Sequence, residues 1–95
     1  MLIRSQDKEK IIILQNVGSI SIRFISENGY AIDAMFTGKT GETIAHYFSK
    51  EKAIKVLDMI QNAYVNYQYS KWVGYERETV IDCIFEMPQD EEVQA

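Results

Sequence analysis

The sequence predicts an α+β fold: an antiparallel β-meander of about five strands, one amphipathic helix packed on one face of the sheet, and a final C-terminal strand. Two observations predict it. Apolar and polar residues alternate within three successive segments, at residues 19–27, 30–37 and 42–48, a spacing typical of half-buried antiparallel strands. From residue 49 the apolar spacing changes to three and four, which is typical of an amphipathic helix.

The strands predicted before residue 19 are short. Residues 2–4 form a candidate edge strand, which a charged turn follows. The β-branched run at residues 11–14 is too short for a helix, so we interpret it as a strand buried on both faces or at the centre of the sheet. A turn signal at residues 16–18 ends it.

The next segment has the clearest hairpin pattern. Residues 19–27 and 30–37 both alternate between apolar and polar side chains. Asn28-Gly29 lies between them, and both residue types tolerate the positive φ that a type I′ turn requires. A glycine-containing turn at residues 38–41 then leads into a strand over residues 42–48.

One helix is predicted over residues 50–69. Ser49 is a good N-cap residue, and Glu51 in the first turn suits the helix dipole. The apolar stripe consists of Ala53, Val56, Leu57, Ile60, Ala63, Tyr64 and Tyr67. A helix of this length has between five and six turns and can cover only one face of a sheet.

The remaining residues predict a loop, a strand and a tail. Residues 70–77 resemble a loop, and residues 78–87 form a strand with apolar side chains on both faces, which favours an interior position in the sheet. We therefore expect one α+β domain over residues 1–87. Residues 88–95 form an acidic C-terminal tail, which we expect to be frayed.

The net charge disfavours nucleic acid as a partner. The 95 residues include 14 acidic and 10 basic side chains, for a formal charge of -4. Proteins that bind a duplex gain affinity by neutralising phosphates with Lys and Arg. Here the basic residues are scattered and have acidic neighbours.

Cysteine content and hydropathy predict a cytoplasmic protein. The one cysteine, Cys83, cannot form an intramolecular disulfide, which suits a reducing compartment. The N-terminus lacks the apolar core of a signal peptide. The longest apolar run, at residues 11–14, is far below the roughly 20 residues that a membrane-spanning helix needs, so we expect no membrane partner.

Catalytic and metal-binding residues are sparse. His46 and Cys83 are the only residues of their types, and neither has companions at metal-ligand spacing. A Cys–His pair can supply a nucleophile and a base, but the neighbours of both residues are apolar, which favours packing. Asp33, Asp82 and Glu86 lie within strand patterns and fit exposed polar faces. We therefore predict no cofactor, no metal and no enzymatic activity.

An aromatic cluster provides the candidate interface: Tyr69, Trp72 and Tyr75. None of the three belongs to the buried helical stripe. Tyr and Trp are favoured at protein interfaces because they bury a large area and lose little rotamer entropy. Two alternatives remain open: a loop folded onto the sheet, and stacking against a ligand or single-stranded bases.

Three stretches of the sequence, at residues 3–7, 49–61 and 85–93, together resemble small uncharacterised proteins of Gram-positive bacteria and of their prophages and mobile elements. The resemblance implies a genomic setting and no particular chemistry. By analogy with small acidic proteins from such elements, it favours a binding protein that regulates or blocks a host component.

The leading functional hypothesis is a non-enzymatic protein-binding or self-assembling module. It follows from the single predicted helix, because the other sheet face must be polar or covered by a partner, and a homodimer is the simplest cover. One alternative is a phage counter-defence protein that blocks a host nuclease or sequesters a nucleotide signal, since an acidic surface can mimic nucleic acid. The other is a small enzyme with a centre formed by Cys83 and His46.

Overall fold

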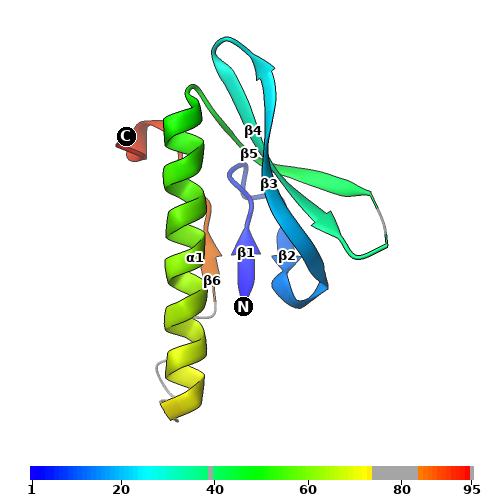
Figure 1. The fold of residues 1–95 in the computed structure, drawn as a ribbon, viewed down its shortest axis with the longest axis vertical. Coiled ribbons are helices and arrows are strands. Elements are labelled where there is room, and N and C mark those ends of the chain that lie inside the picture. Colours follow the sequence, from blue (N-terminus) through cyan, green and yellow to red (C-terminus); the bar gives the residue numbers. More distant parts are fainter. Residues whose placement is uncertain (39, 74–83, 95) are drawn as a thin grey trace.

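The computed structural model describes residues 1–38, 40–73 and 84–94. Its elements, shown in Figure 1, are β1 (Leu2–Arg4), β2 (Ile11–Ile13), the 3-10 helix η1 (Leu14–Asn16), β3 (Val17–Ser26), β4 (Gly29–Phe36), β5 (Gly41–Tyr47), α1 (Lys50–Val73), β6 (Ile84–Glu86) and the 3-10 helix η2 (Asp90–Glu92). The predicted α+β class and the predicted order of five strands, one helix and one strand are confirmed.

The strands divide between two three-stranded sheets. In one sheet the order is β3-β4-β5, and all neighbours are antiparallel. In the other the order is β2-β1-β6, with β1 antiparallel to β2 and parallel to β6. The two ends of the chain therefore lie side by side in the second sheet (Figure 1).

The positions predicted for the terminal strands are wrong. β1, predicted at an edge, is the central strand, and β2, predicted at the centre, lies at an edge. Only Ile12 of β2 is buried, while Ile11 and Ile13 are 59% and 49% exposed, because successive side chains of a strand point to opposite faces. Among the described residues β6 also lies at an edge rather than in the interior; residues 78–83 of the predicted strand lie outside the described ranges.

The β3–β4 hairpin is confirmed, but its turn is displaced by one residue. Ser26 pairs with Gly29, so residues 27 and 28 form the loop. The register also shifts between Phe24 and Ser26, where β3 has one extra residue. Within the described residues, positive φ angles occur only at Lys8 and Gly38, so the predicted type I′ turn is wrong.

The helix begins as predicted and extends further. The Lys52 amide donates a hydrogen bond of 3.2 Å to the Ser49 hydroxyl oxygen, which confirms the N-cap. The helix continues to Val73, so the loop predicted from residue 70 is wrong for residues 70–73. Residues 42–73 contain no glycine and no proline, so nothing in the sequence terminates the helix earlier. Residues 74–77 of that loop lie outside the described ranges.

The core lies between the helix and the inner faces of both sheets (Figure 1). The helix contributes Ala53, Val56 and Ile60. The β3-β4-β5 sheet contributes Ile32, Ala34, Ile44, Ala45 and Tyr47. The β2-β1-β6 sheet contributes Ile3 and Ile12, and Met1, Met87 and Val93 lie beside them. One core therefore supports both sheets, and their outer faces are left uncovered by α1.

The C-terminal segment after β6 packs against the domain, so the expectation of a frayed tail is wrong for residues 88–94. Val93 is buried in the core. The hydroxyl of the buried Tyr47 donates a hydrogen bond of 2.7 Å to the Pro88 carbonyl oxygen. Burial raises the pKa of the Tyr47 phenol, so this group remains a donor across the usual pH range.

Across the described ranges, no helix combines the length and apolar character that crossing a bilayer requires.

Candidate protein interface

The outer face of the β3-β4-β5 sheet is polar at its centre, and Met35, a large apolar side chain on the same face, is 39% exposed. Arg23 on β3 donates a hydrogen bond of 2.7 Å to Asp33 on β4, and Thr43 on β5 donates one of 2.8 Å to the same carboxylate. Arg23 also donates to the Thr43 hydroxyl oxygen at 2.9 Å. The hydrogen bond from Arg23, and then that from Thr43, hold the pKa of Asp33 below its usual 3.8. The hydrogen bonds of these groups are formed within the sheet, so this face is stable in contact with water.

The outer face of the β2-β1-β6 sheet is apolar. Ile13, Leu2 and Ile84 face one another across the three strands, since Leu2 pairs with both isoleucines in the sheet register. The side chains of Ile84 and Ile13 are 50% and 49% exposed. Ile11 lies on the same face, two residues from Ile13. We call Ile11, Ile13, Ile84 and Leu2 the isoleucine face.

Charged groups border the isoleucine face at one end. Arg4 lies between Ile11 and Glu86 in the sheet register. The Lys8 ammonium lies 3.0 Å from the Glu86 carboxylate, and both side chains are mostly exposed. The hydrogen bond from Lys8 lowers the pKa of Glu86. An apolar centre with a polar rim is the usual anatomy of a protein interface.

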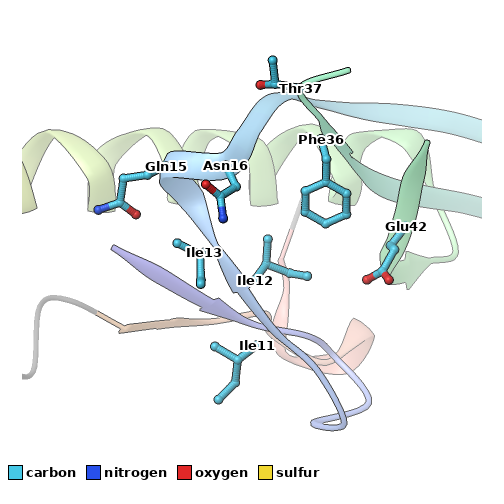
Figure 2. Close-up of a pocket in the computed structure, with 8 residues that line it drawn as sticks. All are labelled: Ile11, Ile12, Ile13, Gln15, Asn16, Phe36, Thr37 and Glu42. Atoms are coloured by element: carbon cyan, nitrogen blue, oxygen red, sulfur yellow. The ribbon is translucent and has the colours of Figure 1, made fainter. Parts of the chain in front are cut away.

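A groove of about 730 Å³ lies beside the outer edge of β2. Figure 2 shows Ile12 of β2 and Phe36 of β4 pointing into it, with Glu42 of β5 at one side. Gln15 and Asn16 of η1 border the other side (Figure 2). No described strand pairs with this edge of β2, so the groove is open along the backbone of an unpaired strand.

The predicted interface residues are only partly described. Tyr69 lies on α1 and is 64% exposed, and Val65 one turn earlier is also exposed. The backbone of Trp72 is helical, three residues beyond Tyr69, but its side chain is not among the described ones, and Tyr75 lies outside the described ranges. The exposure of Tyr69 is compatible with a contact role, which stays a prediction.

Sequence reasoning missed the isoleucine face. The signal was present, because a three-residue strand that follows strict alternation buries only its middle side chain. The run at residues 11–14 was instead interpreted as buried on both faces. Nothing in the sequence indicates that β6 and β2 flank the same strand.

The groups considered for catalysis do not come together among the described residues. His46 is exposed on β5, and its backbone N–H donates to the Gln6 side chain. Cys83 and Asp82 lie outside the described ranges. Asp33, on the β3-β4-β5 sheet, is paired with Arg23, and Glu86, on the β2-β1-β6 sheet, is paired with Lys8. In residues 1–38, 40–73 and 84–94, no three His, Cys, Asp or Glu side chains are grouped so that they could hold a metal ion.

No family model, no curated protein and no solved structure matches this chain.

Proposed function

We propose that the protein is a non-enzymatic protein-binding or self-assembling module, and that the isoleucine face is its contact surface. The observation that carries the proposal is the register of the β2-β1-β6 sheet, which gathers three half-exposed isoleucines and Leu2 on the face that α1 leaves uncovered. Contiguous exposed apolar side chains with a charged border are characteristic of interaction sites.

The energetic gain from covering this face is substantial. Full burial of an isoleucine side chain contributes roughly 1.5–3 kcal/mol. Because each of the three isoleucines is about half exposed, covering them contributes about 1 kcal/mol each, or about 3 kcal/mol in total. That alone is close to a hundredfold in affinity. The polar outer face of the β3-β4-β5 sheet offers no comparable gain.

A pair of matched double variants tests the proposal. Ile13→Thr/Ile84→Thr makes the isoleucine face polar but keeps β-branched residues and every backbone donor. Ser19→Thr/Ser21→Thr is the control on the outer face of the other sheet. We expect wild type and control to self-associate or to capture a partner from a bacterial lysate, and the isoleucine variant to lose that binding by at least about tenfold. Light scattering and quantitative pull-down give the two readouts.

The result can contradict the proposal in two ways. If the double variant matches wild type in molar mass and in every captured protein, the isoleucine face is not a contact surface. Tyr69→Ser provides the comparison with the surface predicted on the helix. If this variant alone abolishes binding, the module binds through α1 instead.

A further inference from the structure

The backbone groups of β2 alternate between its neighbour β1 and the edge at which no described strand is paired. The Ser5 amide donates to the Lys10 carbonyl oxygen, and the Leu14 amide donates to that of Met1. Antiparallel pairs alternate between hydrogen-bonded and non-hydrogen-bonded positions. Ile12 is therefore the bonded partner of Ile3 within the ladder. The N–H and C=O groups of residues 11 and 13 point away from β1, along the free edge.

Residues 11–13 carry no charged side chain, no proline and no bulge, three of the devices that protect an edge strand; the protection that β2 does have is its short length of three residues. Residues 11–14 are Ile-Ile-Ile-Leu. The edge strand β3 differs, because it carries Arg23 and two register shifts. The edge strand β6 carries Glu86. An unprotected apolar edge is a template for pairing with another strand.

The sequence of β2 is complementary to itself. In an antiparallel pair of two β2 strands centred on residue 12, Ile11 lies opposite the partner's Ile13. The four outward-pointing groups of residues 11 and 13 then form four backbone hydrogen bonds across the pair. Lys10 lies opposite the partner's Leu14, so no like charges meet. A single two-fold axis relates the two strands and pairs all the outward-pointing backbone groups of residues 11 and 13, as in an isologous interface.

The surroundings of the edge accommodate a second strand. The groove of about 730 Å³ in Figure 2 lies along β2, on the side toward which Ile12 points. The partner's Ile12 would enter this space beside Ile12 and Phe36. On the opposite face, Ile11 and Ile13 would contact the partner's Ile13 and Ile11, which covers part of the isoleucine face.

We infer that a second copy of this chain pairs with β2 at its free edge, in an antiparallel arrangement about a two-fold axis at Ile12, to form a continuous six-stranded sheet. This inference rests on the proposed function and names its partner. It makes self-assembly, rather than capture of a different protein, the first role of the edge.

Cysteine cross-linking tests the register directly. In a Cys83→Ser background, Ile12→Cys places two thiols at a non-hydrogen-bonded pair whose Cα atoms lie about 4.5 Å apart, within disulfide range. Ile11→Cys is the matched control, because residue 11 faces the partner's residue 13 and not itself. We expect mild oxidation to convert most of the Ile12→Cys chain to a covalent dimer and little of the Ile11→Cys chain.

A proline variant tests the backbone bonds. The φ of Ile13 is -88°, close to the angle that proline imposes, and the N–H of residue 13 points away from β1. Ile13→Pro therefore removes a donor from the proposed contact and none from the fold. We expect an unchanged circular dichroism spectrum and a dimer Kd raised by at least about tenfold. Ile13→Thr, which keeps the N–H, should weaken the dimer less.

The outcomes separate this inference from the proposed function. A monomer throughout a concentration series overturns the edge-paired dimer. So does a dimer that cross-links through Ile84→Cys but not through Ile12→Cys, because that pattern requires two sheets stacked face to face. In both cases the proposed function stands if the isoleucine double variant still loses a bound partner, and it falls only if that variant changes nothing.

Discussion

Asp33 is the residue on which the polar sheet face depends. Its carboxylate accepts hydrogen bonds from Arg23 and Thr43 on the two neighbouring strands, so it connects all three strands of the β3-β4-β5 sheet. Since these bonds lower the pKa of Asp33 in the folded state, its ionised form stabilises the fold. That contribution is present above the unfolded-state pKa and is lost as the pH falls through the lower folded-state pKa.

Asp33→Asn should therefore reduce stability in a pH-dependent way. At pH 7 we expect a loss of roughly 1 kcal/mol, because the exposed Arg23 partner is partly screened by solvent. The difference from wild type should shrink below the usual Asp33 pKa of 3.8 and vanish in stronger acid. Urea unfolding across this range is the measurement. Asp58→Asn on the exposed helix face is the control, and a pH-independent difference at Asp33 would contradict the assignment.

Gly41 is required at the start of β5 because space is lacking. A Cβ atom at this position would lie 2.7 Å from the Ala34 carbonyl oxygen, a backbone atom. Gly41→Ala should destabilise the protein by about 1–3 kcal/mol through overpacking. Gly18→Ala is the matched control, because its Cβ would meet no atom closer than 3.5 Å. Equal unfolding free energies for the two variants would contradict this prediction, because they would show that β5 shifts at Gly41 to accommodate a Cβ atom at no cost.

At the scale of elements, the C-terminal segment stabilises the start of the helix. The Asp90 carboxylate accepts a hydrogen bond of 2.8 Å from the Phe48 amide and lies 2.9 Å from the Lys52 ammonium in the first turn of α1. The bond from the Phe48 amide, and then that from Lys52, lower the pKa of Asp90. Both side chains of the ion pair are largely shielded from solvent.

Asp90→Ala should detach this segment from the helix. We expect a loss of about 1–3 kcal/mol, because the Phe48 amide loses its acceptor and the largely shielded Lys52 ammonium loses its carboxylate partner. Hydrogen exchange should accelerate at the Phe48 and Val93 amides. Glu91→Ala, at an exposed neighbouring position, serves as the control. Unchanged protection at Phe48 would mean that the 3-10 helix η2 stays in place without this carboxylate.

The elements that local sequence determines were predictable. The Ser49 cap, the helical stripe and the alternation in β3 and β4 follow from chemistry within a few residues. The strand positions that were wrong depend on partners far away in the chain. β1 is central only because β6 pairs with its second edge, and no local pattern in residues 2–4 encodes that pairing. The isoleucine face depends on the same distant pairings, so the sequence did not predict it.

At the scale of the whole molecule, polar contacts join the two sheets in addition to the shared core. The Gln6 amide N–H after β1 donates to the Ile44 carbonyl oxygen of β5 at 2.9 Å. The Gln6 side chain donates to the His46 carbonyl oxygen and accepts from the His46 amide. The β4–β5 register shifts at the same place, because Ala45 and Thr43 pair with Ile32 and Asp33 and Ile44 lies between them as an extra residue.

The parallel pairing of β1 with β6 also has a consequence for the synthesis of the chain. The β3-β4-β5 sheet contains only neighbouring strands and can form as soon as residue 47 has left the ribosome. The other sheet cannot be completed until residues 84–86 arrive. Until then β1 has one unpaired edge and β2 has another, both on a strand pair that exposes isoleucine. A nascent or truncated chain therefore presents two unpaired apolar edges on this strand pair, whereas in the described residues of the folded protein β6 covers one of them, the edge of β1.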